Sequence, residues 1–207
     1  MKRYVRFAAA AAITIALSAG VAASLPARAP LASFAVKIDF PAGHGSGTHI
    51  GNGYVLTAAH VVDGGAGIKV LTDTGAAKDA EVLWVNKDYD VALLRIAEFD
   101  DIRSVPLSCA PLERGTRYVA YGNPGSVDFV SAAGAVVGKP EKRGPWRSVV
   151  TVDGTVVPGM SGGGVIVSGR LVGVSVGVMS ASVGLLPSIT GFGFVVPASD
   201  ICGLLAR

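Results

Sequence analysis

Short apolar runs that recur about every ten residues constrain the fold of this chain more than any other feature. From about residue 33 onward, runs rich in Val, Ile, Leu and Thr alternate with Gly, Pro or Asn. Such spacing is typical of an all-β sandwich or barrel. Asn52-Gly53 is a strong hairpin signal, because both turn positions favour positive φ. Helical periodicity is limited to the tail after Pro197, where Ser199 or Asp200 is expected to cap a short helix.

The expected strands form two sets of about six, at about 33–100 and 115–197, separated by a turn-rich connector. The first set comprises 34–38, 47–50, 54–57, 68–72, 81–86 and 91–96. The second set comprises 117–122, 129–137, 148–152, 163–167, 171–179 and 191–196.

The charge distribution excludes nucleic acid as a partner. The 18 basic residues outnumber the 15 acidic ones, but Lys2, Arg3 and Arg6 all precede residue 24. Without 1–23 the chain is neutral and has no Lys/Arg cluster of the kind that nucleic acid demands.

The N-terminus has the three parts of a secretory signal, which predicts an exported protein, periplasmic or extracellular. Basic residues precede an apolar run at 7–23 that ends in small residues. We expect cleavage after Ala23. The alternative is an uncleaved anchor, because the run is almost long enough to span a membrane, and only then would a membrane be a partner.

Two cysteines, Cys109 and Cys202, are too few for a disulfide framework or a four-ligand zinc site. A single disulfide between them and a pair of buried free thiols both remain open for an exported chain.

Two segments carry a candidate base and its partner. His60 follows an apolar strand and is flanked by small residues that let other groups approach the ring. Asp90 precedes four apolar residues, which would carry its carboxylate into a poorly hydrated place. An imidazole N–H is a suitable partner there. Asp88 is expected to be a solvated loop residue. His44 and His49 lie in a glycine-rich loop and strand and lack the apolar strand and small flanking residues found at His60.

A third segment, Pro158-Gly159-Met160-Ser161-Gly162-Gly163-Gly164, carries a candidate nucleophile. Glycines on both sides of the serine permit a tight backbone and unhindered approach of a substrate carbonyl. The turn can aim the N–H groups of Gly159 and Ser161 at one point, as an oxyanion hole. Serine is unreactive at neutral pH without a base. The three segments therefore fit one unit, in which a candidate nucleophile, a candidate base and the carboxylate partner of that base act together.

The order of these residues along the chain selects the class of hydrolase. An α/β-hydrolase needs a histidine after the serine, and none follows Ser161. A subtilisin-type order needs an acid before His60, where only Asp39 stands, together with helices that the pattern does not predict. The order His60, Asp90, Ser161 is that of chymotrypsin.

At these residues the chain resembles the trypsin-like (chymotrypsin-fold) serine peptidases, and especially the protease domain of the bacterial high-temperature-requirement proteases. The resembling segments follow the family's order over most of the chain. They are Gly45-Ser46-Gly47, Gly53-Tyr54-Val55-Leu56-Thr57, Ala59-His60-Val61-Val62, 88–94, Tyr121-Gly122-Asn123-Pro124, Asp153, the serine loop, 171–177 and 191–197. The resemblance implies a protease domain at 24–207 made of two six-stranded antiparallel barrels, with the active site in the cleft between them.

The resemblance also implies how the residues act. Ser161 would attack the carbonyl of a protein or peptide substrate and form an acyl-enzyme, as in a serine endopeptidase. His60 would transfer the proton and Asp90 would orient His60. This chemistry needs no metal or cofactor.

Substrate-binding residues follow from the same resemblance. Ser175 falls where the family places a polar group near the aspartate, and Ser175, Val176 and Gly177 would form the edge strand to which an extended substrate adds. Thr155 would lie at the base of the primary specificity pocket and Gly193 on its wall. Neither is charged, which favours small or medium aliphatic residues before the cleaved bond.

The chain departs from the family at two places. Met160 replaces the aspartate that pairs with a newly cut N-terminus in animal trypsins, so we expect activity without that activation. Since the sequence reaches Arg207 shortly after the resembling segments, we expect no PDZ module of the kind that usually follows in the high-temperature-requirement proteases.

Two other functions remain open. One is a catalytically silent trypsin-fold protein that binds peptides, although the complete set of three residues argues against it. The other is an esterase or acyltransferase that uses the same nucleophile.

Overall fold

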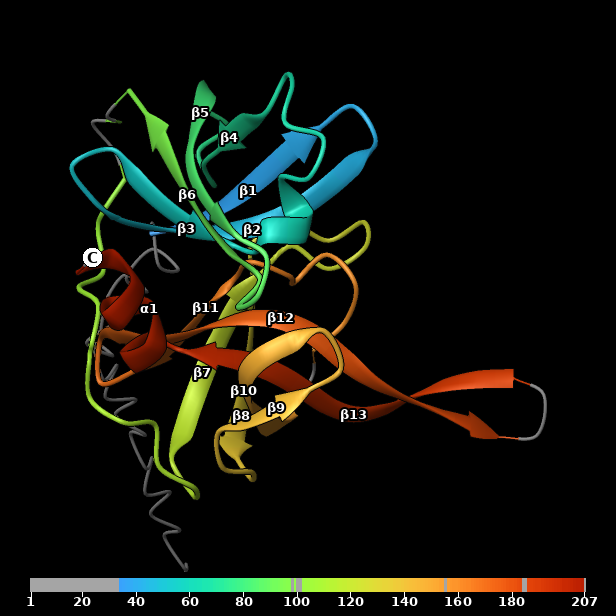
Figure 1. Cartoon of the computed structure of the whole chain (residues 1–207). Helices are drawn as coiled ribbons and strands as arrows, with labels where there is room; N and C mark the ends of the chain where they lie inside the picture. Colours follow the sequence, from blue (N-terminus) through green and yellow to red (C-terminus); the bar gives the residue numbers. More distant parts are fainter. Residues whose placement is uncertain (1–33, 98, 100–101, 155, 184–185, 207) are drawn as a thin grey trace, which may run out of the picture.

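The computed structural model describes residues 34–97, 99, 102–154, 156–183 and 186–206. Its strands form two antiparallel barrels, one from each half of the chain, followed by one short helix (Figure 1). This confirms the expected all-β, two-barrel fold. The expected signal segment 1–23 and Thr155 lie outside the described residues. Within the described ranges, no helix has the length and apolarity needed to cross a membrane.

The first barrel closes in the order β1-β2-β3-β6-β5-β4, because β4 pairs with β1. Its strands are β1 (Ala35–Phe40), β2 (Gly43–Gly51), β3 (Tyr54–Thr57), β4 (Lys69–Leu71), β5 (Ala77–Asn86) and β6 (Val91–Ile96). The β2–β3 hairpin turns at Asn52 and Gly53, whose φ angles of 52° and 70° are those of a type I′ turn. The hairpin prediction is therefore confirmed.

The second barrel closes through pairing of β10 with β13. Its strands are β7 (Arg117–Gly122), β8 (Val130–Val136), β10 (Trp146–Gly154), β11 (Gly164–Val167), β12 (Arg170–Val183) and β13 (Leu186–Pro197), with β9 (Glu141–Arg143) added beside β10. β9 was not expected. β12 and β13 are longer than predicted and continue as a two-stranded ribbon beyond the barrel, at the right of Figure 1.

The C-terminal helix α1 (Ala198–Leu205) packs against β12 and β13. Its N-cap is Pro197, and no side chain caps it, so the expected cap at Ser199 or Asp200 is wrong. The helix begins directly after β13, which places both residues inside its first turn. A disulfide between Cys109 and Cys202 ties α1 to the connector between the barrels, which settles the pairing that the sequence left open.

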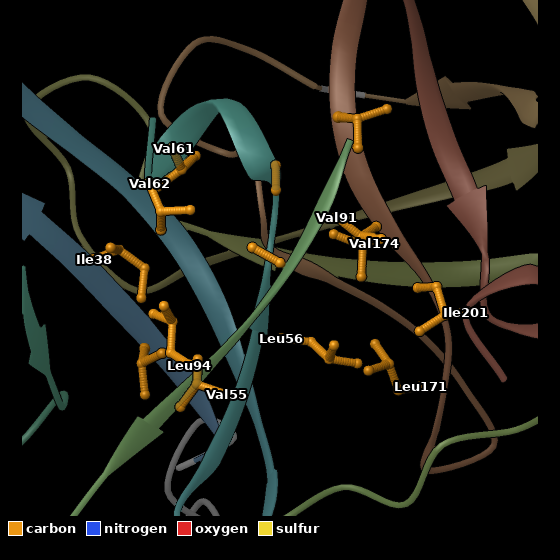
Figure 2. Close-up of a cluster of buried hydrophobic side chains, with 14 of the residues drawn as sticks. Ile38, Val55, Leu56, Val61, Val62, Val91, Leu94, Leu171, Val174 and Ile201 are labelled. Carbon is orange, nitrogen blue, oxygen red and sulfur yellow. The ribbon is translucent and has the colours of Figure 1, made fainter. Parts of the chain in front are cut away.

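One apolar cluster joins the first barrel to the inner face of the second (Figure 2). Leu56 and Val91 of the first barrel belong to it together with Leu171, Val174 and Ile201 of the second half. The second barrel has a separate core of its own. The contact between the barrels is thus part of a continuous hydrophobic core.

We predict that Leu56→Ala lowers the free energy of unfolding by about 2–5 kcal/mol, because it leaves a cavity in this shared cluster. Denaturant unfolding followed by circular dichroism measures the change. Leu83→Ala is the matched control, since Leu83 is 44% exposed and should change stability by less than about 0.5 kcal/mol. Equal losses in the two variants would contradict the assignment of Leu56 to the core.

We predict that Tyr118 makes the free energy of unfolding fall at alkaline pH. Burial, and secondarily the charge of Asp153, raises the pKa of Tyr118 from 10.0 to about 12. Its hydroxyl donates to the Asp153 carbonyl at 3.0 Å. Between pH 10 and 12 the unfolded chain therefore loses this proton while the folded chain keeps it, so stability falls as pH rises. Unfolding at pH 9 and 11 should show a smaller fall for Tyr118→Phe than for wild type; parallel curves would refute this origin.

Candidate active site

His60 and Asp90 form a hydrogen-bonded pair at the inner end of the first barrel. His60 lies on the single-turn helix η1 (Ala59–Val61) after β3, and Asp90 directly precedes β6. His60 Nδ1 lies 2.8 Å from Asp90 Oδ2, and the His60 backbone N–H donates to Asp90 Oδ1 at 2.9 Å. The carboxylate is 11% exposed and the imidazole 48%. Because a carboxylate accepts, the pair favours a proton on Nδ1 and leaves Nε2 as an acceptor. Asp88 is exposed, as expected.

A third donor reaches the same carboxylate from the other barrel. The indole N–H of Trp146, at the start of β10, donates to Asp90 Oδ2 at 3.0 Å. Trp146 was not among the site residues predicted from the sequence. The available signal was a tryptophan directly after the Gly144-Pro145 turn in an otherwise charged segment. Ser175, expected near the aspartate, is buried, and its hydroxyl has no hydrogen-bond partner in the described part of the chain.

The serine loop begins with a tight turn in which the Met160 N–H donates to the Val157 carbonyl at 3.0 Å. Gly159 has a φ of 96°, and Pro158 precedes it, as in a type II turn. Among the described residues, the N–H groups of Gly159 and Ser161 donate to no backbone carbonyl. Both donors are therefore free to receive an anionic oxygen.

The buried Ser46 of β2 anchors the serine loop through hydrogen bonds. The Ser46 hydroxyl of β2 donates to the Gly159 carbonyl at 2.7 Å and accepts from the Asn123 backbone N–H at 2.8 Å and its side-chain Nδ2 at 3.2 Å. Ser46 and Asn123 are both fully buried. The Ser46 N–H also donates to the Ser161 carbonyl at 2.8 Å. Ser46 belongs to the Gly45-Ser46-Gly47 segment that resembles the family, but its contact with the serine loop was not predicted.

Ser161 lies beside the segment that leads to His60. A β-carbon at the next residue, Gly162, would lie 2.2 Å from Thr57 Oγ1 and 2.9 Å from the Ala58 nitrogen. The structure therefore brings the serine loop against the residues just before the histidine. Within the described ranges, Ser161 Oγ forms no hydrogen bond with His60, whereas the His60–Asp90 pair is fully formed.

A cavity of about 420 Å³ opens between the barrels next to the His60 ring. It is lined by Ala59, His60, Asp63, Lys87, Asp90, Pro145, Trp146 and Val176. Asp63 and Lys87 form an ion pair at 3.0 Å on its rim. Both barrels supply the lining, so the cavity lies between them on the His60 side, and Ser161 is not among its lining residues.

The other predicted substrate residues that the structure describes lie on β12 and β13. Ser175, Val176 and Gly177 are consecutive on β12 just after its ladder with β11, and the Ser175 N–H and carbonyl bond to the Gly163 carbonyl and the Gly162 N–H. Gly193 lies on β13, and a β-carbon there would lie 2.6 Å from the Val156 side chain. An apolar side chain therefore lies directly against Gly193.

The two remaining histidines bind backbone carbonyls. His44 Nε2 lies 3.0 Å from the Asn123 carbonyl and His49 Nδ1 lies 2.9 Å from that of Arg103. In the part of the chain that the structure describes, no three His, Cys, Asp or Glu residues group in a way that could hold a metal ion.

Comparison with known proteins gives consistent matches. A family model for the trypsin-like peptidase domain matches residues 45–174. Protease Do-like 1, chloroplastic, of Arabidopsis thaliana is 30% identical over 178 residues, covering 81% of this chain and 40% of that protein. A probable periplasmic serine endoprotease, DegP-like, of Rhizobium meliloti is 33% identical over 167 residues, covering 77% and 32%. The chain thus spans less than half the length of these relatives.

Solved structures share the fold. An inactive form of Rv3671c from M. tuberculosis H37Rv has a TM-score of 0.69 and 27% identity, with 84% of this chain and 85% of the other covered. The HtrA-type protease AlgW with tripeptide has a TM-score of 0.73 at 22% identity, covering 84% and 60%, and supports the fold alone.

We predict that Ser46→Ala lowers the free energy of unfolding by about 1–3 kcal/mol, because it leaves the part-buried Gly159 carbonyl and the buried Asn123 backbone N–H without this partner. Thermal or denaturant unfolding measures the loss. The control is Ser104→Ala, at an exposed serine, which should leave stability within about 0.5 kcal/mol of wild type. An unchanged Ser46→Ala protein would show that the hydroxyl does not hold the loop.

Proposed function

Because the chain belongs to the trypsin-like peptidase domain family, we propose that it is a serine endopeptidase that acts through His60, Asp90 and Ser161. The observation that carries the proposal is the His60–Asp90 pair, whose ring opens into the cleft between the barrels. The relatives named as a protease and as a probable serine endoprotease support the same activity.

In the proposed reaction, Ser161 Oγ attacks the peptide carbonyl while His60 Nε2 takes the hydroxyl proton. His60 then delivers that proton to the leaving amine, and water repeats the sequence in reverse on the acyl-enzyme. Asp90 keeps the ring in the required tautomer and stabilises the transient imidazolium. Ser161 and His60 need only close to hydrogen-bond distance when substrate binds, since such bonds are often long in free enzymes.

The N–H groups of Gly159 and Ser161 would stabilise the tetrahedral oxyanion. Three features support this role: the type II turn, the absence of competing backbone acceptors in the described residues, and the hydroxyl of Ser46 that holds the Gly159 carbonyl away on its other side. The donors are thereby oriented before substrate arrives.

An extended substrate would add as a strand along Ser175, Val176 and Gly177. The ladder between β12 and β11 ends at Val174, which supports that placement at Val176 and Gly177, whereas the Ser175 N–H and carbonyl bond to the Gly163 carbonyl and the Gly162 N–H. The side chain before the cleaved bond would enter the pocket between Thr155 and Gly193. The Val156 side chain against Gly193 supports a preference for small or medium aliphatic residues.

We also propose that the protein is exported, with 1–23 as a cleaved signal peptide. The disulfide supports an oxidising compartment, where such bonds persist. The relative from Rhizobium meliloti is named as periplasmic.

We predict that the purified protein is labelled by a fluorophosphonate probe and cleaves unfolded casein, and that Ser161→Ala and His60→Ala reduce both to background. Ser131→Ala, at an exposed serine of β8, is the matched control and should behave as wild type. Intact mass of the labelled product reports whether 1–23 is present.

Two outcomes would contradict the proposal. Folded wild-type protein that the probe does not label would indicate a silent binding protein. Labelling together with ester hydrolysis but without peptide cleavage would indicate an esterase.

A further inference from the structure

Trp146 links the second barrel to the carboxylate that orients His60. Asp90 Oδ1 accepts the His60 backbone N–H, and Asp90 Oδ2 accepts both His60 Nδ1–H and the Trp146 indole N–H. These three donors come from two barrels and use both oxygens. A carboxylate held at both oxygens cannot rotate without breaking a charge-assisted hydrogen bond.

We propose that Trp146 is a positioning residue for the His60–Asp90 pair and, through its ring, a wall of the substrate cleft. The inference rests on the proposed peptidase function. Trp146 takes the place that the sequence comparison assigned to Ser175, whose buried hydroxyl reaches no partner in the described residues. The donor to Asp90 thus comes from β10, and β12 supplies the surface against which that donor packs.

The backbone of Asp90 shows why an extra anchor is needed. Its φ is 57°, in the left-handed region, which a residue with a side chain occupies at a cost of about 1 kcal/mol or more. The backbone conformation of Asp90 is therefore not the one that the neighbouring residues alone would favour. The hydrogen bonds from His60 and Trp146 offset that cost and keep the carboxylate buried and aimed at the imidazole.

The indole itself is fixed by contacts within the second barrel. A β-carbon at Gly177 would lie 2.7 Å from the Trp146 ring, so only glycine there lets the ring lie against β12. The ring also packs on Phe194, with centroids 5.3 Å apart. Because Gly177 lies on the strand to which substrate would add, Trp146 connects the substrate-binding strand to Asp90.

The same ring faces the cleft beside His60 and Val176. A substrate side chain in the cleft would therefore contact the indole face, while the N–H edge stays on Asp90. We therefore expect two separable kinetic effects from changes at Trp146. Loss of the N–H, which positions Asp90, should lower kcat, and loss of the ring face, which lines the cleft, should raise KM.

The test compares three purified full-length variants with wild type by fluorophosphonate labelling and by kcat and KM on one peptide. Trp146→Phe keeps a ring but removes the N–H, and should lower kcat roughly tenfold with little change in KM. Trp146→Leu removes the ring as well and should also raise KM. Trp84→Phe, which alters the other tryptophan, is the control and should match wild type.

A pH profile separates positioning from a general packing effect. The charged groups near the pair are the Asp63–Lys87 ion pair on the cleft rim and Arg143, whose guanidinium lies over the Phe194 ring. Asp88 and Arg147 also lie nearby, where the Arg147 backbone N–H donates to the Asp88 carbonyl at 2.7 Å. None of these is altered in Trp146→Phe. Without the indole N–H, the Asp90 carboxylate should hold a protonated His60 more strongly, so the acidic limb of kcat/KM should move to higher pH.

A third readout does not require a Trp146 variant to fold. The indole ¹⁵N–¹H signal of Trp146, assigned with Trp84→Phe, should shift in Asp90→Asn. If the fluorophosphonate probe does not react with wild type, the peptidase function is refuted, and the indole signal still tests the contact with Asp90. If the probe does react with wild type, a normal kcat and an unchanged pH profile in Trp146→Phe would overturn the role of Trp146. An unchanged indole signal in Asp90→Asn would also overturn it.

Discussion

The buried carboxylate of Asp90 is the group through which the two barrels hold the histidine between them. It accepts two hydrogen bonds from His60 in the first barrel and one from Trp146 in the second. A buried charge that loses a partner is strongly destabilising. Any separation of the barrels at this point would therefore leave the carboxylate short of a donor, and the geometry around His60 depends on the barrels staying together.

Apolar packing supplies the force that keeps them together. The cluster that contains Leu56, Val91 and Leu171 extends from one barrel to the other without a polar break. Glycines then allow backbone to approach backbone beside this cluster. At Gly162 a β-carbon would lie 2.1 Å from the Ser46 carbonyl, and at Gly177 it would overlap the Trp146 ring. The serine loop and the indole can reach their places only because these positions carry no side chain.

The sequence predicted those features that local patterns specify. Strand spacing gave the two sets of strands, and Asn52-Gly53 gave a hairpin because its turn conformation is a local property. Burial of Asp90 followed from the apolar run behind it. The residues of the site that depend on distant contacts were missed. Nothing near Trp146 in the chain indicates that its N–H meets a carboxylate 56 residues away.

Strand ends and the helix cap were also beyond local patterns. Glycine and serine interrupt the apolar pattern of β12 and β13, so the predicted ranges stopped where the strands leave the barrel, although pairing continues to Val183 and Leu186. The cap prediction failed because β13 continues directly into α1, and Pro197, whose fixed φ suits a helix start, takes the capping position. The disulfide could not be decided from two cysteines 93 residues apart.

The shape of the serine loop is maintained by apolar packing and uncharged hydrogen bonds. Met160 is buried in the second core, so the inner side of the loop is held by apolar packing. On the outer side, the Ser46 hydroxyl donates to the Gly159 carbonyl and accepts from Asn123, both through uncharged hydrogen bonds. Neither anchor titrates, and neither uses an N-terminal amine. The free N–H groups of Gly159 and Ser161 therefore follow from folding itself, which supports the expectation that the proposed oxyanion hole forms without internal cleavage.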